Sequence, residues 1–343
     1  MVSHRRPSQT GLTASARITV LSAAAATAAA AFGAAPAGAE PQESPQATRA
    51  KVDRLYEEAE KATERFNAAG ETAERLRERV ARTQDSVARG QERINRMREA
   101  LGSVAGAQYR SGGVDPALEL FLSADPDTYL ERAAVLERVS ERQSAALGDL
   151  RREQRDLGQE RAEAARDLAD LERSRSAVAR HKRVVERKLS EARRLLNALP
   201  DEERADVDRA SRAGRDDVLP ELAGLAPGSA HAAAAALAAR SAVGRPYVWG
   251  ANGPSGFDCS GLVQWSYAQA GVGLPRTSQA QANAGRRIPL SEARPGDIVT
   301  YRGDASHVGM YMGNGQVVHA PYPGAAVRYD PVGMMPVHAV TRV

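Results

Sequence analysis

The sequence predicts an α+β domain at the C-terminal end of the chain, preceded by a long antiparallel α-helical coiled-coil hairpin. Apolar residues recur at alternating spacings of three and four over residues 52–104, and a second seam with polar breaks covers residues 129–199. Both patterns are typical of coiled coils. An aromatic content of 4% also favours long helices over one large core. The α+β domain is predicted by the helix and strand patterns that follow residue 230.

The first 39 residues have the pattern of a secretory signal peptide. Three arginines accompany an Ala-rich apolar stretch at residues 18–32, and Ala37-Gly38-Ala39 forms a small-residue cleavage site. We therefore expect a secreted, extracellular protein, exported by the Sec or the twin-arginine route; a retained membrane anchor is the alternative. Removal of the three arginines lowers the formal net charge from +4 to +1. The charge therefore gives no reason to expect a nucleic-acid partner.

A tip separates the two helical segments of the hairpin. Ser111-Gly-Gly-Val-Asp-Pro breaks the helix pattern, and Asp125-Pro126 restarts it. We place the hairpin at residues 48–200, with its tip at 111–128.

The register of this hairpin is predicted to leave two apolar surfaces uncovered. If Val104 faces Tyr129, Val52 lies near His181, and residues 182–199 have no partner helix. The two surfaces are the tip around Leu118, Phe121 and Leu122, and an overhang at Val185, Leu189 and Leu196. We expect the tip to dock on a membrane partner and the overhang to contact the C-terminal domain. Self-association into a dimer is the alternative.

A linker at residues 201–229, charged and then rich in Gly and Pro, leads into the C-terminal domain at residues 230–343. Some helix is expected near Asp206. The domain is predicted to open with an Ala-rich helix and to end in a small antiparallel sheet.

Cys259 is the only cysteine in the chain. A loop rich in Gly and Pro ends at Phe257, and Asp258 is placed to cap a helix, so Cys259 lies in its first turn. The unpaired N–H groups there favour a thiolate and suit an oxyanion. A secreted chain with one cysteine forms no internal disulfide, which favours a reactive thiol over an intermolecular bridge or an inert buried residue.

Two histidines, His307 and His319, lie on strand-like segments joined by Gly313-Asn314-Gly315, a strong hairpin signal. Side chains alternate between the faces of a strand, so a two-residue turn would place the two imidazoles on opposite faces. Cooperation between them therefore requires a three-residue turn or a bulge.

With Cys259 at a helix start and two histidines on strands, the domain resembles the NlpC/P60 family of papain-like cell-wall peptidases. The matching motifs are Tyr247-Val-Trp-Gly, Phe257-Asp-Cys-Ser-Gly-Leu-Val, Leu274-Pro-Arg-Thr-Ser-Gln, Arg294-Pro-Gly-Asp-Ile-Val, and His307-Val-Gly-Met-Tyr-Met-Gly-Asn-Gly followed by His319. A small departure is Thr300-Tyr301, where the family usually has two aromatic residues. The resemblance covers residues 230–343.

The resemblance implies a cysteine endopeptidase that cuts peptidoglycan stem peptides, at the bond between γ-D-glutamate and the diamino acid. Cys259 would attack the carbonyl, with His307 as general base and then acid, and His319 would orient His307 and favour its protonated form. The substrate-binding residues that the resemblance implies are Tyr247, Asp258 and Ser260. The residues alone do not decide between this role for Asp258 and an alternative in which Asp258 only caps the helix.

The layout of the whole chain also resembles exported actinobacterial and Gram-positive wall hydrolases that join a coiled coil to such a domain. This resemblance implies that the coil masks the active-site groove until a division-associated ABC-type membrane complex releases it. It also implies that the protein is associated with the cell wall.

Three other classes of protein stay open. Cys259, His307 and His319 have the ligand types of a zinc site, although their spacing is a weak signal. Another Cys–His amidase or acyl transferase acting on the wall would share the same residues, and a non-enzymatic coiled-coil scaffold or activator would not use them. The sequence has no cofactor motif or phosphate-binding loop, so we expect no cofactor and no resident metal.

Overall fold

The computed structural model describes residues 44–110, 116–122, 126–212 and 227–343. The predicted signal peptide lies outside these residues. Within them, no helix is both long enough and apolar enough to cross a membrane.

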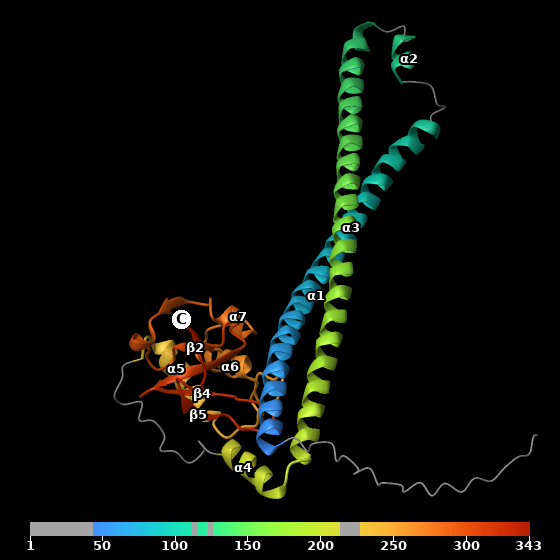
Figure 1. The fold of residues 1–343 in the computed structure, drawn as a ribbon. Helices are drawn as coiled ribbons and strands as arrows, with labels where there is room; N and C mark the ends of the chain where they lie inside the picture. Colours follow the sequence, from blue (N-terminus) through green and yellow to red (C-terminus); the bar gives the residue numbers. More distant parts are fainter. Residues whose placement is uncertain (1–43, 111–115, 123–125, 213–226) are drawn as a thin grey trace, which may run out of the picture. The chain divides into compact units, whose positions relative to one another are not determined.

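Two long antiparallel helices, α1 (Pro45–Arg110) and α3 (Pro126–Asn197), form the coiled-coil hairpin, with the short helix α2 (Pro116–Phe121) between them (Figure 1). The prediction of a long antiparallel coil is confirmed. Its seam is built from apolar layers, because side chains three and four residues apart lie on one face of a helix. The layers are Val52 and Leu55 with Ala192, Ala59 and Ala62 with Val185 and Leu189, and Leu76 and Val80 with Leu171.

The register of the coil differs from the predicted one. Val52 packs near Ala192, not near His181. Helix α1 continues to Arg110 and α2 follows before α3 begins, so the turn uses more residues than we expected and α3 is displaced along α1. The predicted lack of a partner helix is therefore wrong, since Val185 and Leu189 are buried against α1. The expected contact with the C-terminal domain is confirmed, because Trp249 packs against the same cluster.

The part of the coil that lacks a partner helix lies instead at the beginning of α3. Leu130 and Val135 are exposed there. Val104 faces Val139 and Gln143, rather than Tyr129, across a cavity of about 360 Å³ between the two helices. The apolar surface without a partner helix is thus at the end of the coil that carries α2.

After the coil, helix α4 (Asp201–Arg212) occupies the first part of the predicted linker. Arg49 of α1 forms an ion pair with Glu203 of α4. Residues 213–226 lie outside the described residues.

The C-terminal domain is α+β, as predicted. Its elements are α5 (Ala230–Ser241), α6 (Cys259–Gln269), α7 (Ser278–Gln281), β1 (Arg286–Ile288), η2 (Leu290–Glu292), β2 (Ile298–Tyr301), β3 (His307–Gly313), β4 (Gln316–His319), β5 (Arg328–Pro331) and β6 (Val337–Arg342). The strands form one sheet in the order β1-β6-β2-β3-β4-β5, with antiparallel neighbours. The main core joins α5 and α6 to one face of this sheet, through side chains such as Ala239, Leu262, Tyr267, Ile298 and Met310.

The β3–β4 hairpin settles the position of the two histidines. Asn314 and Gly315, both with positive φ, form a two-residue turn between Gly313 and Gln316. The pairing is then irregular between Tyr311 and Gly313, and such an extra residue restores the alternation. The bulge that we required is confirmed, and both imidazoles lie on one face.

Candidate active site

Cys259 is the first residue of helix α6, and Asp258 is its N-cap, as predicted. Asp258 Oδ1 accepts a hydrogen bond from Gly261 N at 2.7 Å. A side chain at position 261 would collide with the carbonyl oxygen of Ala251, so only glycine lets the loop pass this close to the helix. The cap and this close approach place the Cys259 sulfur at the helix start.

Asp258 also forms a buried ion pair that the sequence did not single out. Both of its oxygens accept from the Arg276 guanidinium, at 2.9 and 2.6 Å. The same guanidinium donates to Ser260 Oγ at 2.9 Å, and Gly250 N donates to Asp258 Oδ2 at 3.0 Å. Asp258 is therefore more than a helix cap, because it connects the loop, the helix start and Arg276. The signal for Arg276 was its position in the Leu274-Pro-Arg motif.

The two histidines form a chain of hydrogen bonds behind the sulfur. His307 Nε2 lies 2.8 Å from His319 Nδ1, and His319 Nε2 lies 2.7 Å from Asp330 Oδ2. Both imidazoles are fully buried. Burial lowers the pKa of His319 to about 4, although the hydrogen bond to Asp330 opposes that effect. His319 is therefore neutral at pH 7, and Asp330 is a further member of the site that sequence reasoning missed.

Tyr247 completes the predicted set around Cys259. Its side chain is buried beside Cys259, in the same core. Burial, and then the proximity of Cys259, raise the pKa of the Tyr247 hydroxyl well above its usual range. The structure thus brings together all six predicted residues: Cys259, His307, His319, Tyr247, Asp258 and Ser260.

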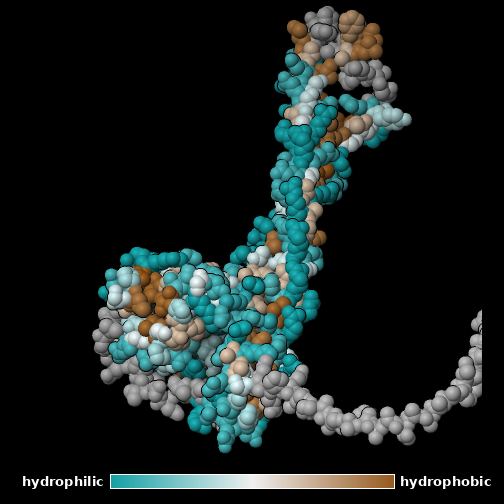
Figure 2. Space-filling model, in the orientation of Figure 1, coloured by the Kyte–Doolittle hydropathy of each residue, from teal (hydrophilic) through white to brown (hydrophobic). Residues whose placement is uncertain are grey.

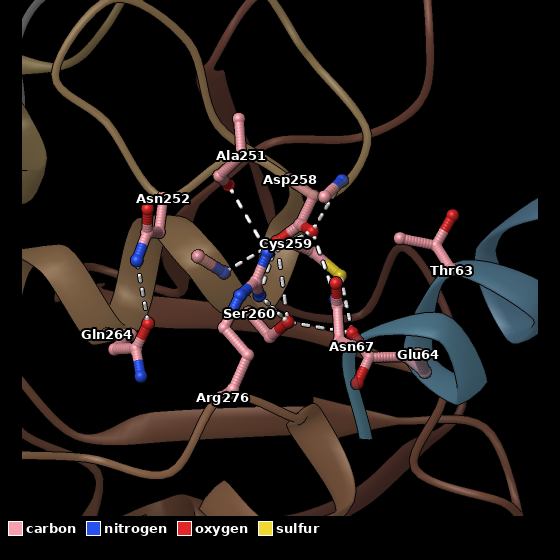
Figure 3. Close-up of polar contacts among 12 residues, drawn as sticks. Thr63, Glu64, Asn67, Ala251, Asn252, Asp258, Cys259, Ser260, Gln264 and Arg276 are labelled. Atoms are coloured by element: carbon pink, nitrogen blue, oxygen red, sulfur yellow. Dashed lines mark hydrogen bonds and ion pairs between the residues drawn. The ribbon is translucent and has the colours of Figure 1, made fainter. Parts of the chain in front are cut away.

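Helix α1 covers this site with a stripe of polar side chains (Figure 3). Glu60 Oε1 lies 2.5 Å from His307 Nδ1, and Glu60 Oε2 accepts from Arg302 at 2.6 Å. Glu64 accepts from Ser260 Oγ at 2.7 Å and from Ser278 N at 2.8 Å.

Two further contacts of the stripe reach the catalytic helix itself. The Cys259 sulfur lies 3.8 Å from Glu64 Oε1. One turn further along α1, Asn67 Nδ2 donates to Asp258 Oδ2 at 3.1 Å. We call Glu60, Glu64 and Asn67 the acidic plug.

Aromatic contacts flank the acidic plug on both sides. Tyr56 stacks on Tyr322 with ring centroids 5.1 Å apart, and Phe66 meets Trp249 edge-on at 5.2 Å. These pairs place the polar stripe between two apolar contacts.

The acidic plug changes the protonation of the site. Burial, followed by the charges of Glu64, Glu60 and Asp258, raises the pKa of the Cys259 thiol well above its usual range. The predicted thiolate at the helix start is therefore not favoured in this structure, because burial and then the nearby carboxylates outweigh the helix N-terminus.

The two carboxyl groups of the acidic plug behave differently. Burial raises the pKa of Glu64 to about 7, with a further contribution from Asp258. The pKa of Glu60 is lowered in spite of its burial, because His307 and Arg302 favour its ionised form.

One group of potential metal ligands occurs among the described residues. It consists of Glu60, Cys259 and His307, whose ligand atoms lie within 4.8 Å of one another. His319, the third ligand of the zinc hypothesis, instead uses its two ring nitrogens for His307 and Asp330. The geometry therefore fits a Cys–His pair with an attached carboxylate better than the zinc set suggested by the sequence.

Taken together, the fold and the site define a class: an α+β domain with a cysteine at the start of a helix and a His–His–Asp chain on the adjoining sheet. Residues 244–340 match the NlpC/P60 family. The C-terminal domain of this chain belongs to that family.

Several known proteins are similar to part of this chain. A probable endopeptidase of Mycobacterium tuberculosis is 50% identical over 95 residues, which cover 28% of this chain and 25% of that protein. A probable endopeptidase of Corynebacterium glutamicum is 44% identical over 117 residues, covering 34% of this chain and 56% of the relative. The peptidoglycan endopeptidase RipA of Mycolicibacterium smegmatis is 47% identical over 113 residues, and the match covers 28% of this chain and 23% of that protein.

Among solved structures, the NlpC/p60 domain of the peptidoglycan hydrolase SagA is 35% identical, with a TM-score of 0.31, and the match covers 33% of this chain and 98% of that one. The chain spans between 23% and 56% of the length of the curated relatives named above.

Proposed function

We propose that this protein is a secreted cysteine endopeptidase that hydrolyses peptidoglycan stem peptides. The observation that carries the proposal is the placement of Cys259 at the start of α6, with a ring nitrogen of His307 within 4.8 Å of its sulfur and the His319–Asp330 chain bonded to the other side of that ring. The relatives with similar domains are named endopeptidases, and one of them a peptidoglycan endopeptidase.

The reaction follows from these positions. The Cys259 thiol gives its proton to Nδ1 of His307, and the thiolate attacks the peptide carbonyl. Backbone N–H groups at the start of α6 stabilise the oxyanion. The leaving amine takes the proton from His307, which leaves an acyl-enzyme thioester. A water molecule then transfers a proton to His307 while its oxygen attacks the thioester carbonyl; the C–S bond breaks, the acid product leaves, and His307 returns the proton to the Cys259 thiolate.

The proposed cleavage site is the bond between γ-D-glutamate and the diamino acid, with Tyr247, Asp258 and Ser260 around the amino end of the stem peptide. Asp258 supports this role. Its oxygens accept from Arg276, Gly261 N, Gly250 N and Asn67. When Asn67 leaves, Oδ2 regains an acceptor position that suits a substrate ammonium group.

A direct test is mass spectrometry of the fragments released from purified peptidoglycan. We expect new amino termini at the diamino acid for the piece containing residues 228–343, which keeps the Ser229 cap of α5, and none for its Cys259→Ala variant. Cleavage at a different bond contradicts the assigned specificity. Inhibition by a chelator but not by a thiol alkylator contradicts the cysteine mechanism and favours the zinc hypothesis.

The proposal includes a latent state in which helix α1 keeps the site closed. Two facts support this. The Cys259 sulfur and the His307 ring are buried under Glu60 and Glu64, which leaves no room for a peptide. In addition, an ionised Glu60 only accepts hydrogen bonds, so His307 Nδ1 must donate to it. The base then has no lone pair for the thiol proton, and the site is disabled chemically as well as sterically.

Masking is tested by comparing hydrolysis rates of residues 44–343 and residues 228–343. We expect the shorter piece to be more active by at least about tenfold, since closure by as little as ~1.4 kcal/mol gives that factor. Equal rates in both proteins would rule masking out.

Release requires a partner that pulls on the coil. Exposed apolar side chains at the end of the coil, Leu118, Phe121 and Leu122, form the proposed docking surface, and Figure 2 shows brown hydrophobic groups at that end. A division-associated ABC-type membrane complex is the partner that we propose. Self-association through the same surface is the alternative, and the mass of residues 44–199 in solution distinguishes them, because a tight dimer would cover the surface.

A further inference from the structure

Asp330 lies on the edge strand β5, and the pairing of β5 with β4 brings it to His319. Val317 pairs with Asp330, and His319 pairs with Arg328. Residues two apart share a face of the sheet, so His319, Arg328 and Asp330 lie together on one face. Their placement depends on the domain alone and not on helix α1.

Asp330 Oδ2 is an acceptor for two groups at once. His319 Nε2 lies 2.7 Å from this oxygen, and Arg328 Nε donates to it at 2.9 Å. Hydrogen bonds from His319 and Arg328 lower the pKa of Asp330 although burial raises it. Asp330 is thus an ionised carboxylate, which accepts hydrogen bonds and donates none.

The proton positions along the chain follow from that charge. Because Asp330 only accepts, His319 Nε2 must carry the proton, and the Nδ1 of a neutral His319 is then a lone-pair acceptor. His307 Nε2 must in turn donate to His319 Nδ1. A neutral His307 in this arrangement has its lone pair on Nδ1. One ring nitrogen of His307 lies within 4.8 Å of the Cys259 sulfur, and because Nε2 is bonded to His319, Nδ1 is the nitrogen left to serve Cys259.

We propose that Asp330 is a positioning residue that fixes the tautomers of both histidines and so keeps the base lone pair of His307 directed at Cys259. The inference rests on the proposed thiol chemistry. When the thiol proton moves to His307 Nδ1, the imidazolium keeps its Nε2 proton and donates to His319. No proton reaches Asp330, whose negative charge stabilises the cation through His319.

Arg328 makes this role distinguishable from a purely structural one. A guanidinium has only donors, so without Asp330 the Arg328 side chain would donate to His319 Nε2 itself. His319 would then carry its proton on Nδ1 and donate to His307 Nε2. The neutral His307 would be protonated at Nδ1, which is the wrong tautomer for a base.

The structure provides matched variants. In Asp330→Asn the amide oxygen can accept from both donors, so the tautomers are kept and only the charge is lost. In Asp330→Ala the acceptor is lost, and we expect the Arg328 Nε–H that Asp330 accepted to turn to His319 Nε2 while Arg328 stays over the Tyr322 ring. In the double variant Asp330→Ala with Arg328→Met, a water molecule can accept from His319 Nε2. The adjoining cavity of about 260 Å³, lined by His319, Arg328 and Asp330, has room for it.

The experiment uses the full chain carrying Glu60→Ala and Asn67→Asp, so that no plug carboxylate holds the His307 proton. Nitrogen-15 spectra of the labelled histidines at pH 8 report which ring nitrogen of His319 carries hydrogen. We expect Nε2–H in the parent and in Asp330→Asn, Nδ1–H in Asp330→Ala, and a return to Nε2–H in the double variant. An unchanged Nε2–H signal in Asp330→Ala overturns the proposal.

Hydrolysis of peptidoglycan by the same proteins provides the second measurement. We expect kcat to fall roughly 100-fold in Asp330→Ala, with KM nearly unchanged, because general-base catalysis contributes factors of this size. In the double variant, kcat should be about tenfold higher than in Asp330→Ala. A merely structural Asp330 would instead make the double variant equal to or worse than Asp330→Ala, and that result overturns the proposal.

The matched control is Asp297→Asn, which removes the charge of another buried aspartate paired with an arginine, Arg342. It should alter stability and leave the histidine spectra unchanged. If the parent shows no hydrolysis, the proposed function fails, while the spectra still decide the role of Asp330.

Discussion

The two ends of the coiled coil differ in what they bury. Around residues 52–67, helix α1 packs against α3 with one face and against the C-terminal domain with another, through Glu60, Glu64 and Asn67. At the other end, Leu130 and Val135 are exposed and a cavity separates the helices. The end around residues 52–67 thus forms specific polar contacts, whereas the end around residues 130–135 leaves apolar side chains exposed.

Under the proposed masking, this difference would let one helix both close the site and open it. Polar contacts in a buried interface depend strongly on geometry, so a small displacement of α1 breaks them. Loosely packed apolar surface can gain free energy when a partner covers it. Binding at the loose end would therefore be converted into loss of contacts at the tight end.

The largest effect is expected from Asn67→Asp. The new carboxylate would lie about 3 Å from Asp258 Oδ2, and two buried like charges cost on the order of 3 kcal/mol. We expect roughly a 100-fold shift toward the open state, measured as faster alkylation of Cys259 in the full chain. Asn95→Asp, on the exposed part of α1, is the matched control. Equal alkylation rates in the two variants would show that Asn67 does not hold the helix.

A smaller effect is expected from shortening a buried side chain in the apolar seam of the coiled coil. Leu189→Ala removes a buried side chain that packs on Ala59 and Ala62, at a cost of about 2–3 kcal/mol. Leu147→Ala, at a site nearly half exposed, should cost less than about 0.5 kcal/mol. Thermal unfolding and Cys259 alkylation measure both. Equal changes in stability and alkylation rate for the two variants would show that the two parts of the coil do not differ in how tightly they pack.

The pH dependence of closure is expected to be weaker still. Glu64 has a pKa of about 7 in the closed state, against about 4.5 once exposed to solvent. Glu64 therefore favours the closed state most below pH 4.5, this contribution weakens as pH rises from 4.5 to 7, and Glu64 contributes no further change above 7. Asp258, Arg276 and Cys259 face this carboxyl group, and Glu60 opposes the trend at acid pH because its pKa is lowered.

Hydrogen exchange of α1 amides between pH 5 and pH 8 measures this effect, and Glu64→Gln should flatten the profile. Increasing protection with rising pH would contradict the assignment of Glu64 as the controlling group.

The smallest effect is expected from Phe121→Ser at the exposed end. The side chain is 77% exposed, so the free energy of unfolding should change by less than about 0.5 kcal/mol. Light scattering should give the same mass as for the parent. A change from dimer to monomer would instead show that this end is a self-association surface.

Local patterns predicted much of the site. The Asp258 cap, the position of Cys259 and the bulge between the histidines follow from backbone chemistry within a few residues. The acidic plug could not be found this way, because Glu60 and Glu64 lie on a charged coil face that normally contacts water. Their spacing with Asn67, at i, i+4 and i+7, places them on one face, which is the signal that was available.

The register of the coil and Asp330 were missed for a different reason. The register depends on how many residues the turn between α1 and α3 uses, which seam patterns do not encode. Asp330 acts only after β5 pairs with β4, a contact that is not local in sequence. The expected Cys259 thiolate was wrong for this state because tertiary contacts outweighed the helix start.

The acidic plug and the nucleophile belong to a single polypeptide. An inhibitor attached to its target acts at a fixed local concentration, commonly in the millimolar range, however dilute the protein becomes. The fraction of inhibited molecules would therefore not depend on the concentration of the protein. Each copy would also carry its own restraint from synthesis onward, since the blocking helix precedes Cys259 in the chain.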